Sequence, residues 1–69
     1  MKATGLQVTP KAHSARKIQE VIAESDFYAE YNSEFGYWFF EEDEANYDSL
    51  EAEINNLLTG CDYRIEGVF

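Results

Sequence analysis

Residues 24–53 constrain the fold more than any other part of the chain. They hold eleven carboxylates and nine of the eleven aromatic residues, with no lysine or arginine. Acidic segments that stay disordered also have high net charge, but they contain few aromatic side chains. We therefore expect this stretch to fold, with its carboxylates on the surface. A rigid anionic surface indicates a cationic partner.

The charge is divided unevenly along the chain. Residues 1–23 carry a net charge of +3 and residues 24–69 a net charge of −12, which gives −9 overall. The length predicts a single domain over residues 1–69, and a domain of this size buries only about 60% of the surface that its unfolded chain exposes. Because like charges repel within the fold, high salt should stabilise it.

Cysteine content and hydropathy indicate the cellular compartment of the protein. Cys61 is the single cysteine, so there is no internal disulfide framework, and no Cys/His cluster offers zinc ligands. The apolar run at residues 37–40 is far too short to span a membrane, and the N-terminus has no hydrophobic signal region. We expect a cytoplasmic protein with no cofactor, metal or membrane association.

The first third of the chain predicts an extended segment and a helix. Residues 2–8 form either a strand or an extended arm. Thr9 suits a helix N-cap and Pro10 the first helical position. An apolar stripe at three- and four-residue spacing follows, made of Ala12, Ala15, Ile18, Val21 and Ile22.

A β-hairpin is predicted next, with strands at residues 27–32 and 37–42 joined by four residues that end in glycine. In the second strand Tyr37 and Phe39 face one side, and Trp38 and Phe40 face the other. Either both faces are buried, or one aromatic face stays open for a partner or a second copy. One pair is assigned to the core and the other is left undecided.

The last third predicts a helix and a strand. Asp48 is the expected N-cap, with Glu51 completing a variant capping box, and Gly60 ends the helix. The apolar stripe of this helix is Leu50, Ile54, Leu57 and Leu58, and residues 61–66 then alternate apolar and polar. The fold class is α+β, with an antiparallel sheet and two helices on one face. Its order is βαββαβ (ferredoxin-like) if residues 2–8 are a strand, and αββαβ otherwise.

Enzymatic and metal-dependent functions have little support. The single histidine, His13, lies early in a basic helix, and Cys61 lies at a helix-to-strand turn. Glu41 and Glu42 are adjacent in a strand and point to opposite faces, so they do not form an acid–base pair. Residues 41–48 supply five oxygen ligands, but an EF-hand loop starting at Asp43 places Ala45 and Asp48 where a ligand and the glycine belong. We expect no catalytic residues.

The acids also argue against direct nucleic-acid binding. Residues 36–39 resemble the aromatic platform of an RNA-recognition domain, but their flanks are acidic where that platform needs cations. Mimicry of DNA fits better. Duplex DNA has one phosphate per roughly 1.7 Å of axis when both strands are counted. Strand residues two apart lie about 6.5–7 Å from one another, which is close to the spacing of successive phosphates along one DNA strand. The competing interpretation is an ordinary solvated charge run, which the lack of any Lys or Arg over thirty residues disfavours.

Four short motifs carry a family resemblance. They are Tyr31-Asn32, Gly36-Tyr37-Trp38-Phe39, Leu50-Glu51-Ala52-Glu53-Ile54 and Tyr63-Arg64-Ile65-Glu66-Gly67-Val68-Phe69. Together they look like the N-terminal module of ArdA-type antirestriction proteins, over residues 31–69. Small acidic phage proteins that inhibit CRISPR complexes are similar in size and charge. The resemblance implies DNA mimicry against a restriction enzyme or another DNA-binding defence complex.

The leading hypothesis is a non-enzymatic inhibitor that occupies the basic DNA-binding surface of a bacterial defence complex. The alternative is a small interaction or dimerisation module, antitoxin-like, that binds through its aromatic strand. A homodimer is left open. The expected partner-binding residues are Glu30, Glu34, Glu41, Glu42, Asp43, Glu44, Asp48, Glu51, Glu53 and Trp38.

Overall fold

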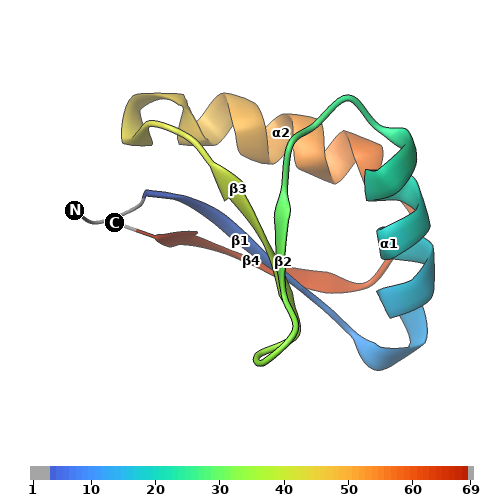
Figure 1. Ribbon diagram of the computed structural model, residues 1–69. Coiled ribbons are helices and arrows are strands. Elements are labelled where there is room, and N and C mark those ends of the chain that lie inside the picture. The colour runs from blue at the N-terminus through green and yellow to red at the C-terminus, as the bar shows by residue number, and fades with distance from the viewer. Residues whose placement is uncertain (1–3, 69) are drawn as a thin grey trace.

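The computed structural model describes residues 4–68 and contains two α-helices and a four-stranded antiparallel sheet (Figure 1). Residues 2 and 3 of the first predicted segment, and Phe69, lie outside the described part. In chain order the elements are β1 (Gly5–Pro10), a 3₁₀ turn (Ala12–Ser14), α1 (Ala15–Glu24), β2 (Glu30–Asn32), β3 (Tyr37–Glu41), a second 3₁₀ turn (Glu44–Asn46), α2 (Tyr47–Leu57) and β4 (Tyr63–Val68).

The sheet has the strand order β2-β3-β1-β4, with every neighbouring pair antiparallel. The α+β class is therefore confirmed. Because Gly5–Pro10 is a strand, the element order is βαββαβ, the first of the two predicted orders. The strand β1 lies inside the sheet between β3 and β4, so the first and last segments of the chain are hydrogen-bonded neighbours.

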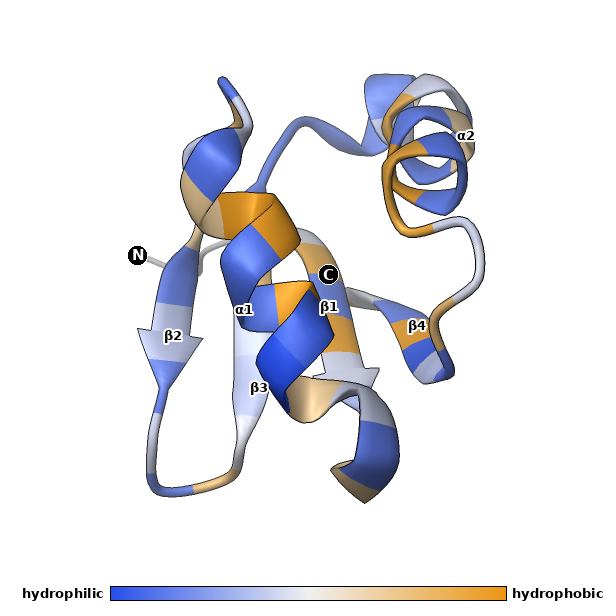
Figure 2. Cartoon of the chain, turned by 90° about the vertical axis from the view of Figure 1, so that its right-hand side faces the viewer, coloured by the Kyte–Doolittle hydropathy of each residue, from blue (hydrophilic) through white to orange (hydrophobic). Residues whose placement is uncertain are grey.

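Both helices contribute to one core on one face of the sheet. The register pairs Leu6 with Phe40, and Val8 lies two residues beyond Leu6, so these three side chains share a face. Against them pack Ile18 and Ile22 of α1 and a set from the α2 region: Tyr47, Leu50, Ile54 and Leu58. Figure 2 shows α1 beside β2 and β3, with α2 on the β4 side. Ala12 and Ala15 of the predicted first stripe are exposed.

The predicted beginnings of both helices are wrong. Pro10 is the last residue of β1, opposite Tyr63, and α1 starts only after a 3₁₀ turn. Proline is tolerated there because a strand end need not supply every ladder donor. Asp48 is not an N-cap. Asn46 holds that position without a side-chain cap, because the preceding 3₁₀ turn already winds into the helix, and Asp48 lies in its first turn.

The hairpin is confirmed, although β2 is shorter than predicted. Its four-residue link closes through a 2.7 Å bond from the Gly36 amide to the Asn32 carbonyl oxygen. The Asn32 side-chain oxygen accepts the amides of Glu34 and Phe35. Gly36 has a φ of +72°, which glycine adopts without steric cost. The turn chemistry was therefore sufficient to predict the loop.

Candidate functional site

The sheet face opposite the helices carries the second aromatic pair. Since Trp38 and Phe40 point toward the helices, Tyr37 and Phe39 project from the other side, where they are half-buried. The exposed ring of Phe35 stacks on Tyr37, with a centroid distance of 6.5 Å and an interplanar angle of 14°. The pair that the sequence left undecided therefore lies on the face that neither described helix covers.

Carboxylates border these rings on the same face. Glu30 lies opposite Phe39 in the β2–β3 register, and Glu41 is two residues further along β3. The Tyr28 hydroxyl donates a 3.0 Å hydrogen bond to Glu30. The pKa of Tyr28 is raised above its usual value by this bond, then by the charge of Glu30, by burial and by the charge of Glu41. The strand register places Glu30 and Glu41 in one corner of the open face.

A hollow of about 440 Å³ lies at the hairpin beside this corner. Glu30 and Glu34 line it together with the rings of Tyr37 and Phe39. A Lys or Arg side chain entering here would meet both negative charges beside two aromatic residues, which are the partners of a cation–π contact. The aromatic and acidic residues thus form one surface at the hairpin, which we call the hairpin hollow.

The carboxylates of the 41–44 link differ in their environment. Glu42 is half-buried, and its side-chain oxygen accepts the amide of Asp43 at 2.9 Å. Its own amide donates to the Thr4 carbonyl oxygen. Asp43 and Glu44 are exposed, and their backbone carbonyl oxygens rather than their side chains accept bonds in the turn. Glu42 therefore stabilises the turn, whereas its two neighbours are free to meet a partner.

The carboxylates of α2 lie on two flanks of the helix. Asp48 and Glu51 are one turn apart and share a flank, but Glu53 is about 200° around the helix from Glu51. All three are exposed. Since α2 covers the core face of the sheet, these acids lie across the molecule's thickness from Glu30 and Glu41. The expected carboxylates thus form two groups. Glu30 and Glu41 belong to the sheet face, Asp48, Glu51 and Glu53 belong to α2, and the rest of the 41–44 link connects the two groups.

Trp38 lies apart from both groups. It is half-buried on the core side of β3, where its ring meets that of Tyr31 at a centroid distance of 4.9 Å. A partner on the open face would touch Tyr37 and Phe39 rather than Trp38.

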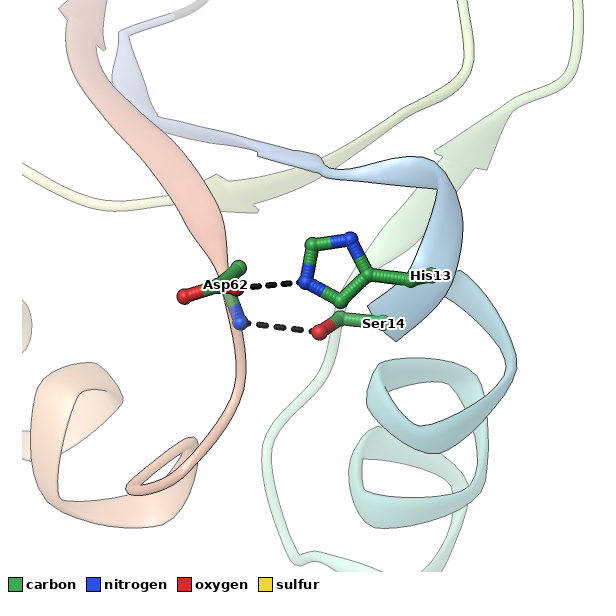
Figure 3. A network of polar contacts seen from close by, with 3 residues as sticks. All are labelled: His13, Ser14 and Asp62. Carbon is green, nitrogen blue, oxygen red and sulfur yellow. Dashed lines mark hydrogen bonds and ion pairs between the residues drawn. The ribbon is translucent and has the colours of Figure 1, made fainter.

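Near the start of α1 lies a polar network that the sequence does not predict. Asp62 bonds His13 through its carboxylate at 2.5 Å, and its amide donates to the buried Ser14 hydroxyl oxygen at 2.9 Å (Figure 3). The Asp62 carbonyl oxygen accepts the amide of Lys11. No hydrogen bond joins the Ser14 hydroxyl to the His13 ring in the described residues, so the nucleophile–base contact of a catalytic triad is not formed here. The network joins the β1–α1 and α2–β4 connections, and no local pattern reveals a pairing 48 residues apart.

Residues 4–68 contain no group of His, Cys, Asp and Glu side chains arranged to hold a metal ion. Within the same residues no helix has the length and apolar character needed to cross a bilayer. Comparisons with protein-family models, curated protein sequences and solved structures find no match for this chain.

Proposed function

We propose that this protein is a non-enzymatic DNA mimic that occupies the basic DNA-binding surface of a bacterial defence complex. The observation that carries the proposal is uncompensated charge. Ten of the eleven carboxylates in residues 24–53 are exposed. The ion pairs of the described residues, His13 with Asp62 and Arg64 with Glu66, involve none of the eleven.

The carboxylates of such a surface make few stabilising interactions within their own fold and would make many with a cationic partner. An exposed carboxylate loses only weak interactions when a cation approaches, and the summed field accelerates encounter. The hairpin hollow adds a position where a guanidinium or ammonium group meets rings as well as charge. The partner class, a restriction enzyme or a CRISPR effector, rests on the resemblance of residues 31–69 to ArdA-type modules.

The test is inhibition of DNA cleavage by purified restriction enzymes and CRISPR effectors. The informative variant is Asp43→Lys, Glu44→Lys and Glu51→Lys together. It spares Glu42, which stabilises the turn, and Asp48, which suits the positive end of the α2 dipole. We expect inhibition by the unaltered protein that weakens steeply with salt, and at least tenfold weaker inhibition by the variant.

A matched control separates local from overall charge. Glu20→Lys, Glu24→Lys and Asp26→Lys change exposed residues in and just after α1, and they raise the net charge from −9 to −3, as the test variant does. This control should keep most of the inhibition. Equal loss in both variants would mean that overall charge alone acts, and salt-independent inhibition would contradict the mimicry.

A second candidate is an interaction module that binds through the open sheet face. It is favoured by the position of Tyr37 and Phe39 on the face that neither described helix covers. Tyr37→Ala distinguishes it in the same assays, because loss of a ring should then matter more than reversal of three charges. Trp38→Ala is less informative, since Trp38 packs on the core side.

A further inference from the structure

A second hollow, on the opposite side of the sheet from Tyr37 and Phe39, differs from the acidic surface in its chemistry. It has a volume of about 500 Å³ and lies where α1 faces the β2–β3 hairpin. Its lining includes Arg16, Gln19, Tyr31, Trp38 and Pro10, and it contains no carboxylate. This volume is within the range of small-molecule sites, which combine apolar walls with a few polar groups.

Two aromatic rings form one wall. Tyr31 and Trp38 are directly paired across β2 and β3, and their rings are tilted by 49°. Tyr31 remains 53% exposed although it points to the same side as the core, because β2 is the edge strand. A flat ring entering the hollow would therefore have an aromatic surface to pack against, and ring pairs gain stability beyond their buried area.

The polar groups come from α1. Arg16 and Gln19 are three residues apart on this helix, so they lie on neighbouring turns of one face. Arg16 is exposed and has no ion pair among the described residues. A guanidinium group binds a carboxylate through two parallel hydrogen bonds. The hollow thus offers an aromatic wall and an available fork of donors.

We infer that this hollow binds a small planar aromatic carboxylate, with its ring against Tyr31 and Trp38 and its carboxylate on Arg16. Preference for an anion is the opposite of what the negative overall charge favours. A protein with a net charge of −9 attracts cations nonspecifically, so selection of an anion would have to come from the local groups. The inference does not depend on the proposed DNA mimicry.

Trp38 is the single tryptophan of the chain, so its indole N–H signal in a ¹⁵N-labelled sample is unambiguous and reports on a residue that lines this hollow and not the hairpin hollow. The probes are 2-naphthoate, 2-naphthamide and 2-naphthylmethylammonium, which share a ring and differ in charge. We expect a saturable shift of the Trp38 signal with 2-naphthoate, and at least tenfold weaker binding of the amide and of the cation.

Two substitutions on α1 complete the test. Arg16→Gln should weaken 2-naphthoate about tenfold, because it removes the charge-assisted hydrogen bonds between the guanidinium group and the carboxylate. It should leave 2-naphthamide unchanged. Lys17→Gln removes the same charge from the next, exposed residue, which does not line the hollow, and should change binding less than twofold. Absence of a saturable shift, tighter binding of the cation, or equal effects of the two substitutions would each overturn the inference.

Discussion

At the scale of single residues, Gly5 shows how closely the open sheet face is packed. A Cβ atom at this position would lie 2.2 Å from the Phe40 carbonyl oxygen and 2.8 Å from the Phe39 ring. The Phe39 ring therefore lies against the β1 backbone, and glycine is required here for close approach rather than for an unusual φ. Phe39 is thus part of the scaffold as well as part of the hairpin hollow.

Replacing Gly5 with alanine should destabilise the fold. One of the two clashing atoms belongs to the backbone, which cannot rotate away, so overpacking should lower the free energy of unfolding by about 1–3 kcal/mol. Urea denaturation followed by circular dichroism measures the change. The matched control is Gln7→Ala, on the same strand and face, which should stay within about 0.5 kcal/mol. An equally small effect for Gly5→Ala would show that the two strands separate at no cost.

At the scale of elements, local patterns predicted what is local. The alternation of residues 37–40 assigned their faces, and the glycine that ends the hairpin link marked the turn. The helix starts were wrong because proline and aspartate fit several positions near a helix end, and two 3₁₀ turns shift the boundaries. The bonds from Asp62 to Lys11, His13 and Ser14 could not be predicted, since they depend on the completed sheet.

The same network supports a prediction about how the elements are joined. In Ser14→Ala the Asp62 amide loses its acceptor in a part-buried site, which should cost about 1–3 kcal/mol of unfolding free energy. The control is His13→Ala, which removes an exposed ion pair and should cost no more than about 1 kcal/mol. Thermal and urea unfolding of both variants measure the difference. A larger effect for His13 would mean that the ion pair, not the buried hydroxyl, holds the two connections together.

At the scale of the whole molecule, the carboxylates form two groups rather than one patch. The sequence placed them close together along the chain, but β3 carries Glu41 on the open face while α2 carries Glu51 beyond the core face. Only the sheet topology decides this separation. A partner would therefore have to contact the hairpin, the 41–44 link and one flank of α2 to use most of the charge.

Salt should have opposite effects on folding and on binding. Salt screens the repulsion among the exposed acids. A like-charge pair costs about 0.2–0.5 kcal/mol, so relieving a few such pairs should raise the melting temperature of a domain of this size by several degrees. We expect the melting temperature to rise with NaCl while affinity for a basic partner falls.

The two triple-lysine variants divide these effects. Both have a net charge of −3, so both should show a shallower rise of melting temperature with salt than the unaltered protein. Only the change at Asp43, Glu44 and Glu51 should also weaken inhibition. Differential scanning calorimetry over a NaCl series measures the first effect, and cleavage assays over the same series measure the second. A melting temperature that does not respond to salt would mean that the acids are too widely spaced to repel one another, and hence too widely spaced to imitate a phosphate backbone.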